Sequence, residues 1–88
     1  MVTITRMDLD PDYVTPQTVH SAFDFAVKYP ALTKEWNQTT NSVINLAAKD
    51  EEHLLELYNK FKDLTPSVLF FEPDINAYTT VALYGTEN

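Results

Sequence analysis

Hydrophobic and polar positions along the 88-residue chain change their period several times, and each change marks a predicted element. Residues 1–9 alternate in character and predict a strand. Thr15 and Pro16 suit the N-cap and first position of a following helix, since the missing proline N–H costs nothing there. Pro30 ends this helix. Its expected buried face is an apolar stripe at helical spacing, formed by Val19, Ala22, Phe23, Ala26 and Val27.

The middle of the chain predicts a short helical turn, a strand and a second long helix. The turn covers residues 31–36, and a polar loop follows over residues 37–41. Residues 42–48 are apolar and partly β-branched, which predicts a central buried strand. Asp50 suits the N-cap of the next helix. The buried stripe of that helix is expected to consist of Leu54, Leu57, Tyr58 and Phe61.

Two strands close the chain, one over residues 67–72 and one over residues 79–84, with a turn at residues 73–77 between them. The resulting order of elements predicts an α/β fold with three layers. Helices pack on a small mixed four-stranded sheet, and the last two strands are antiparallel neighbours or near neighbours. We expect one domain over residues 1–88, because a chain of this length has room for one core.

Charge and composition narrow the function classes. Six Lys and Arg residues face 13 Asp and Glu residues, which gives a net charge of −7. A chain this acidic repels nucleic acid at long range unless its few cations cluster. The chain has no cysteine, which excludes disulfides and thiolate metal sites. No secretory signal or membrane span is apparent, so the cytoplasm is the expected location and no membrane partner is expected.

Several familiar sites are excluded by the residues present. A single glycine rules out glycine-rich phosphate loops and dinucleotide-binding motifs. Asp8, Asp10 and Asp12 imitate the start of a calcium loop, but Tyr13 occupies the glycine position and Val19 the final glutamate position. A solvated acidic turn is the better interpretation. We therefore expect neither a metal ion nor a cofactor.

Short motifs distributed over nearly the whole chain resemble those of the type 2 peptidyl-tRNA hydrolases, in particular short variants of that family. The family carries Arg-x-Asp-Leu at the end of its first strand and Gln-x-x-His-Ala at the start of its first helix. The corresponding residues here are Arg6-Met7-Asp8-Leu9 and Gln17-Thr18-Val19-His20, with Ser21 in place of the alanine. Later matches are Tyr29-Pro30-Ala31-Leu32, Lys34-Glu35-Trp36, the segment from Asp50 to Leu57, and Asp74 with Thr79-Thr80-Val81-Ala82-Leu83.

The resemblance implies hydrolysis of the ester between a peptide and the 3′ end of tRNA. Because strand ends and a helix start converge at one edge of such a sheet, we expect Asp8, Gln17, His20 and Asp74 to lie within one shallow cleft. His20 and Asp74 would activate water, and Gln17 with helix-start N–H groups would hold the oxyanion. The implied substrate-binding residues are Arg6, Asp8 and Thr79. Arg6 would be the only cation near the cleft.

The chain also departs from the family. No lysine precedes Gln17, where the family has Gly-Lys, and the loop after Asp74 is compact. A non-catalytic, acidic interaction module that binds a basic protein surface is therefore an alternative, as is an enzyme for a smaller acyl ester. A homodimer also stays open. Structural roles compete at single residues: packing or capping for His20, turn formation for Asp74, and bonding of Asp8 to the backbone near Gln17. The aromatic residues Phe70, Phe71, Tyr78 and Tyr84 are expected in the core or on a sheet face.

Overall fold

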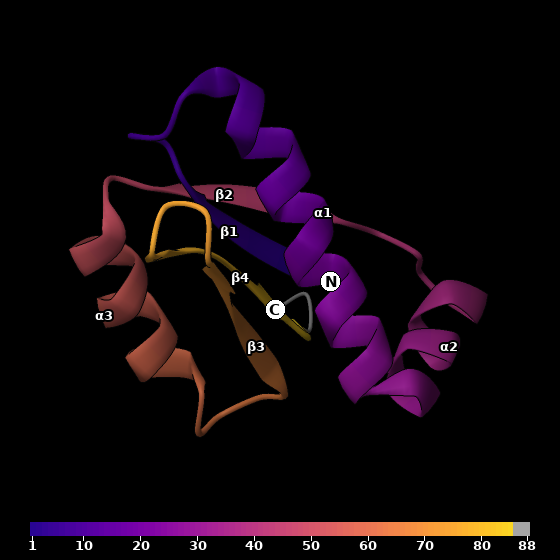
Figure 1. Ribbon diagram of the computed structural model, residues 1–88. Coiled ribbons are helices and arrows are strands. Elements are labelled where there is room, and N and C mark those ends of the chain that lie inside the picture. The colour runs from indigo at the N-terminus through magenta and orange to yellow at the C-terminus, as the bar shows by residue number, and fades with distance from the viewer. Residues whose placement is uncertain (86–88) are drawn as a thin grey trace.

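Four strands and three helices make up the protein in the computed structural model, which describes residues 1–85. In chain order they are β1 (Val2–Arg6), α1 (Pro11–Lys28), α2 (Pro30–Gln38), β2 (Ile44–Ala48), α3 (Glu51–Phe61), β3 (Ser67–Glu72) and β4 (Ala77–Leu83). The strands form one sheet in the order β2-β1-β4-β3 (Figure 1). β1 and β2 are parallel, whereas β4 is antiparallel to both of its neighbours. The predicted mixed sheet with antiparallel final strands is confirmed.

Two apolar clusters cover the two faces of the sheet and give the fold its three layers. Val81 of β4 packs with Leu54 of α3, whereas its neighbour Ala82 packs with Phe25 of α1. Successive residues of a strand point to opposite faces, so α1 and α3 lie on opposite sides of the sheet. Phe25 and Leu54 are the large apolar anchors of the two helices, and both are fully buried.

The start of α1 corrects the sequence prediction. The N-cap is Asp10, whose side chain accepts a hydrogen bond from the Asp12 N–H at 2.9 Å, and Pro11 is the first helical residue. Asp10-Pro11 offers the same combination of cap and proline as Thr15-Pro16, but it lies five residues earlier. Pro16 therefore lies inside the helix.

The face that α1 buries also differs from the prediction. Phe23 and Val27 are 66% and 82% exposed, while Gln17, Ser21 and Phe25 are buried. The sheet beneath α1 presents buried threonines, and their hydroxyl groups need polar partners. Gln17 and Ser21 supply those partners, so this side of α1 turns inward. Val19, Phe23 and Val27 of the predicted stripe point away, whereas Ala22 still packs against the cluster that contains Phe25.

β2 is an edge strand rather than the central buried strand that its sequence predicts. It lies at the margin of the sheet (Figure 1), and four of its five residues are exposed. Only Ala48, at its end, packs under α3 beside Leu54. α3 lies mainly over β4 and β1, and Ile44 and Leu46 stay about half exposed among residues 1–85.

The sequence signals for the start of α3 and for β3 are confirmed. Asp50 caps α3 and accepts the His53 N–H at 2.8 Å, as predicted. β3 follows Pro66 and has the predicted bounds, whereas β1 is shorter than expected and α2 is longer. Within residues 1–85, no helix has both the length and the apolar composition needed to cross a bilayer.

Candidate functional site

A β-bulge in β4 turns the side chains of two consecutive threonines, Thr79 and Thr80, toward α1. Phe70 of β3 pairs with Thr80 and Phe71 pairs with Tyr78, so Thr79 is an extra residue on β4. Such a bulge breaks the alternation of the strand. Both threonine hydroxyls consequently meet α1: Thr79 Oγ1 lies 2.7 Å from Gln17 Oε1, and Thr80 Oγ1 lies 3.2 Å from Ser21 Oγ.

Both the nitrogen and the oxygen of the Gln17 side-chain amide are hydrogen-bonded. Its Nε2 donates to Glu72 Oε2 at 2.8 Å, and its Oε1 accepts from the Thr79 hydroxyl. An ionised carboxylate only accepts hydrogen bonds, so the amide nitrogen must face Glu72 and the amide oxygen must face Thr79. Gln17 is 2% exposed. In this arrangement it holds Glu72 in place and presents no open surface to a ligand.

Glu72 ends β3 and is buried. Its Oε1 also accepts the backbone N–H of Asp74 at 3.2 Å. The hydrogen bond from Gln17 is the main cause that holds the pKa of Glu72 below its usual value, followed by the Asp74 N–H. The charge of His20 acts in the same direction, and burial opposes it. Glu72 is therefore a fixed carboxylate with a histidine nearby.

His20 lies three residues after Gln17 on α1 and is exposed. Its ring stacks on Phe70 of β3, with 4.9 Å between centroids and 12° between planes. Neither ring nitrogen makes a hydrogen bond to any residue from 1 to 85. The imidazole is thus oriented by an aromatic neighbour, close to Glu72, with both nitrogens available.

A chain of hydroxyl groups fixes α1 against the sheet next to this site. Thr5 of β1 lies 2.5 Å from the Thr18 hydroxyl and 3.0 Å from the Thr80 hydroxyl. Thr18 and Ser21 also donate to carbonyl groups of α1 itself. Because every member has a partner, this buried polar layer specifies how α1 is rotated, and hence where His20 lies.

Asp74 occupies the turn after β3 and is exposed. Its carboxylate accepts no hydrogen bond from any other residue in the described part of the chain, and its contact with the site is the backbone N–H that reaches Glu72. Asp74 therefore does not orient His20 in this structure. His20 interacts electrostatically with Glu72 instead.

Arg6 and Asp8 form a pair of their own at the end of β1. Arg6 Nε and Nη2 donate to the two Asp8 oxygens at 2.9 and 2.7 Å, and Nη1 donates to the Tyr78 carbonyl at 3.1 Å. The bond to Asp8 is the main cause that raises the pKa of Arg6, and the reverse bond lowers the pKa of Asp8. Asp8 thus bonds Arg6, and the expected bond to the backbone near Gln17 is absent.

The expected source of oxyanion donors is also absent from this site. α1 begins at Pro11, so the N–H groups of its first turn extend no further than Tyr13, which lies seven residues before His20 and roughly 10 Å from it along the axis at 1.5 Å per residue. Two of those groups are already bonded to Asp10, those of Asp12 and Tyr13. Backbone amides at the start of the helix cannot reach a group beside His20.

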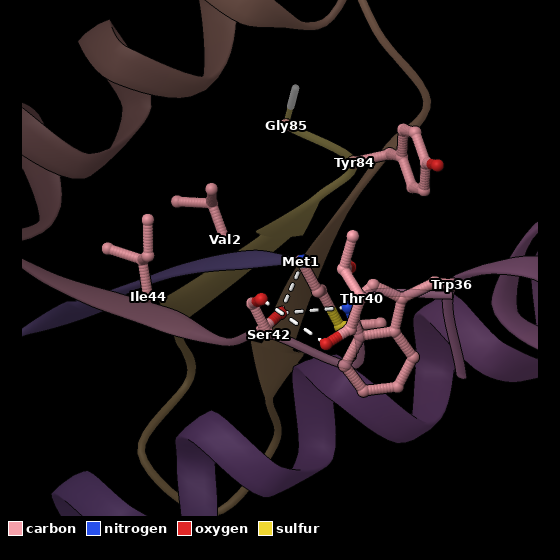
Figure 2. A pocket seen from close by; sticks show the side chains of 8 residues that line it. All are labelled: Met1, Val2, Trp36, Thr40, Ser42, Ile44, Tyr84 and Gly85. Atoms are coloured by element: carbon pink, nitrogen blue, oxygen red, sulfur yellow. Dashed lines mark hydrogen bonds between the residues drawn. The ribbon is translucent and has the colours of Figure 1, made fainter. Parts of the chain in front are cut away.

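A surface hollow of about 230 Å³ lies elsewhere, near the first residues of β1 and β2 (Figure 2). The Ser42 carbonyl accepts from the Met1 amino group and from Trp36 Nε1, both at 2.8 Å. None of the lining residues belongs to the predicted site; they are Met1, Val2, Trp36, Thr40, Ser42, Ile44, Tyr84 and Gly85. Gln17 lies buried beneath α1, so it does not line the shallow cleft that the sequence predicted.

Glu72 and Thr80 belong to the polar cluster, although the sequence assigned no role in a site to either residue. One signal was available for Glu72, an acidic residue that ends an otherwise apolar strand immediately before Pro73. The bulge that brings Thr79 and Thr80 to the same side has no comparable signal, because it depends on the pairing between β3 and β4.

Comparison with known proteins adds no assignment. A scan against models of protein families finds no match, and a search of curated proteins finds none either. Among residues 1–85, no group of three or more His, Asp or Glu side chains is arranged to hold a metal ion. The case for a function therefore depends on the geometry around His20.

Proposed function

We propose that this protein hydrolyses an ester of the peptidyl-tRNA type, releasing the peptide from the 3′ end of the tRNA, with His20 as the catalytic base. The supporting observation is the position of an exposed imidazole, which stacks on Phe70 of β3, beside the buried Glu72 carboxylate that Gln17 holds by a hydrogen bond. Gln17 positions Glu72 through a hydrogen bond, and Thr79 in turn fixes the orientation of the Gln17 amide. The motif resemblance that singles out Gln17 and His20 supplies the substrate class.

The chemistry follows from the placement of the imidazole. An unprotonated ring nitrogen of His20 takes a proton from water, and the water oxygen attacks the carbonyl carbon of the ester. The bond from this carbon to the ribose oxygen then breaks, and the ribose oxygen receives the proton from the imidazolium. The Glu72 carboxylate stabilises the imidazolium between these two steps, because the opposite charges are close.

Substrate affinity is expected to be low. A net charge of −7 opposes the approach of a polyanion, and Arg6, the cation closest in sequence to the site motifs, is already neutralised by Asp8. The domain would therefore recognise the ester end of the substrate and make few contacts with the body of the tRNA. Activity is best sought at low ionic strength.

Turnover of peptidyl-tRNA by purified protein tests the proposal. Replacing His20 with alanine should lower kcat by about 10²- to 10⁴-fold, the usual contribution of a general base. His53→Ala is the matched control, since His53 lies on α3 and accepts the Lys49 N–H. Wild-type protein that fails to hydrolyse the substrate at low salt, or a His20→Ala variant with unchanged kcat, would overturn the proposal.

Two observations favour a second function, a non-catalytic acidic module that binds a basic protein surface. The amide of Gln17 is bonded at both ends, and helix-start amides are too far away to hold an oxyanion. Binding of a lysine-rich protein by the wild type, with no hydrolysis of peptidyl-tRNA, would favour this function.

A further inference from the structure

β2 exposes both apolar side chains and an unpaired backbone edge in the described part of the chain. Its side chains Ile44 and Leu46 are 47% and 50% exposed, and the preceding Val43 is 57% exposed. It is also the last strand on its side of the sheet (Figure 1). Exposed, apolar edge strands are surfaces on which another strand can pair.

The backbone of β2 has a definite outward-facing set of groups. Ile44 N–H donates to the Met1 carbonyl, and the Ala48 carbonyl accepts the Met7 N–H, so both of these residues face β1. Residues alternate along a parallel ladder, and therefore the N–H and C=O groups of Val43, Asn45 and Ala47 point away from β1. These groups have no strand beside them among residues 1–85.

We propose that β2 pairs antiparallel with β2 of a second copy of this chain, which joins two four-stranded sheets into one sheet of eight strands. Asn45 lies opposite Asn45 of the partner subunit, on a two-fold axis perpendicular to the sheet. The outward N–H and C=O groups of Val43, Asn45 and Ala47 then all find partners.

The side chains select this register. With Asn45 on the axis, Ile44 lies opposite the partner's Leu46, and Leu46 lies opposite the partner's Ile44. All four apolar side chains then meet on the face of the sheet that carries α3, because Ala48 on the same side of β2 packs beneath α3. Shifting the axis to residue 44 sets Leu46 against Ser42 of the partner subunit. Shifting it to residue 46 sets Ile44 against the partner's Ala48.

The uncharged stretch around β2 is where two copies of this acidic chain can meet. Each copy carries −7, so most contacts between two copies bring like charges together. Residues 41–48 form an uncharged stretch, which keeps the acidic residues away from the shared strand pair. Added salt should strengthen the dimer because it screens the remaining repulsion.

The test compares molar mass in solution, by light scattering or sedimentation, for wild type and three variants. Ala47→Pro removes one outward N–H and leaves the bonds to β1, a change that edge strands tolerate. Ala47→Val keeps the N–H and should stay dimeric. Leu46→Lys places a charge on the shared face and should be monomeric. This variant still tests the interface if Ala47→Pro fails to fold.

Phe23→Lys provides the matched control for an exposed apolar residue elsewhere. Phe23 and Val27 lie one turn apart on the outer side of α1 and are 66% and 82% exposed. Phe23→Lys should leave the dimer intact. A dimer that is lost in Phe23→Lys but kept in Ala47→Pro would place the interface on α1 and overturn the proposal, as would a wild type that is monomeric at every concentration.

Cross-linking tests the register, since the chain has no natural cysteine. In Asn45→Cys the two introduced residues should lie about 5.5 Å apart between Cα atoms, within the range of a disulfide. In Leu46→Cys they would be offset along the strands, roughly 8 Å apart, too far to bridge. Oxidation should therefore link Asn45→Cys and spare Leu46→Cys. The reverse result would overturn the register.

Discussion

Removing the hydroxyl of Thr79 tests the part of the site that holds Glu72. Thr79→Val keeps a β-branched side chain in β4 but takes away the donor to Gln17 Oε1, 2.7 Å away. Both residues are almost completely buried, so water has no evident route to replace the hydroxyl. The amide of Gln17 is then free to turn, and its bond to Glu72 loses the constraint that fixed it.

The expected cost follows from the acceptor left without a partner. A buried polar group in that state destabilises a protein by about 1–3 kcal/mol. In a domain of this size each kcal/mol lowers the Tm by roughly 4–8 °C, so Thr79→Val with a cost of about 2 kcal/mol should lose about 8–16 °C. Apolar packing alone predicts the opposite, because valine is the more hydrophobic residue.

Thermal unfolding followed by circular dichroism measures the effect, with Thr79→Ser as the control. Serine keeps the hydroxyl and loses a methyl group, which costs about 0.8 kcal/mol. We expect stability to decrease in the order wild type, Thr79→Ser, Thr79→Val. A Thr79→Val protein as stable as the wild type would show that the hydrogen bond to Gln17 contributes nothing, and the positioning argument for Glu72 would fail with it.

Two further predictions concern acid stability and helix capping. The pKa of Glu72 lies below its usual value of 4.5 in the folded protein, so its carboxylate stabilises the fold above that pH and the contribution is lost as pH falls through the lowered pKa. The stability difference between wild type and Glu72→Gln, measured by urea unfolding, should therefore shrink on acidification below pH 4.5; a difference independent of pH would contradict this. Asp50→Ala removes the acceptor for the His53 N–H and should cost about 1 kcal/mol, whereas Asp63→Ala, outside α3, should have little effect on the same urea midpoint.

The sequence predicted the elements that depend on short-range signals. Asp50 identified the start of α3, and Pro66 preceded β3 at the predicted bounds. Caps and prolines act through their own backbone neighbourhood, so they are readable without knowledge of the tertiary fold. Two equivalent signals can still compete, and Asp10-Pro11 prevailed over Thr15-Pro16 at the start of α1.

The position of β2 in the sheet and the contacts of the site residues depend on tertiary packing, which the hydrophobic pattern does not predict. The apolar run at residues 42–48 is typical of a central strand, but β2 pairs only with β1 in the described part of the chain and α3 packs mainly over β4 and β1. Within the site, Gln17 and Thr79 were both singled out from the sequence and are bonded to each other. Their link to Glu72 depends on the bulge in β4, which arises only when β3 and β4 pair.

The polar layer under α1 and the apolar stripe above it are consequences of one helix orientation. Val19 lies two residues after Gln17, roughly 200° around the helix axis, so burying one exposes the other. Burying Phe23 and its neighbours would gain about 1.5–3 kcal/mol per side chain, but each threonine hydroxyl stranded below would cost about 1–3 kcal/mol. These terms are similar in size, so the hydrophobic pattern alone does not decide the orientation. The hydrogen bond from Gln17 to Glu72 and the one that Ser21 accepts from Thr80 favour the observed one, and that orientation places His20 over Phe70, on the side of α1 that carries Gln17.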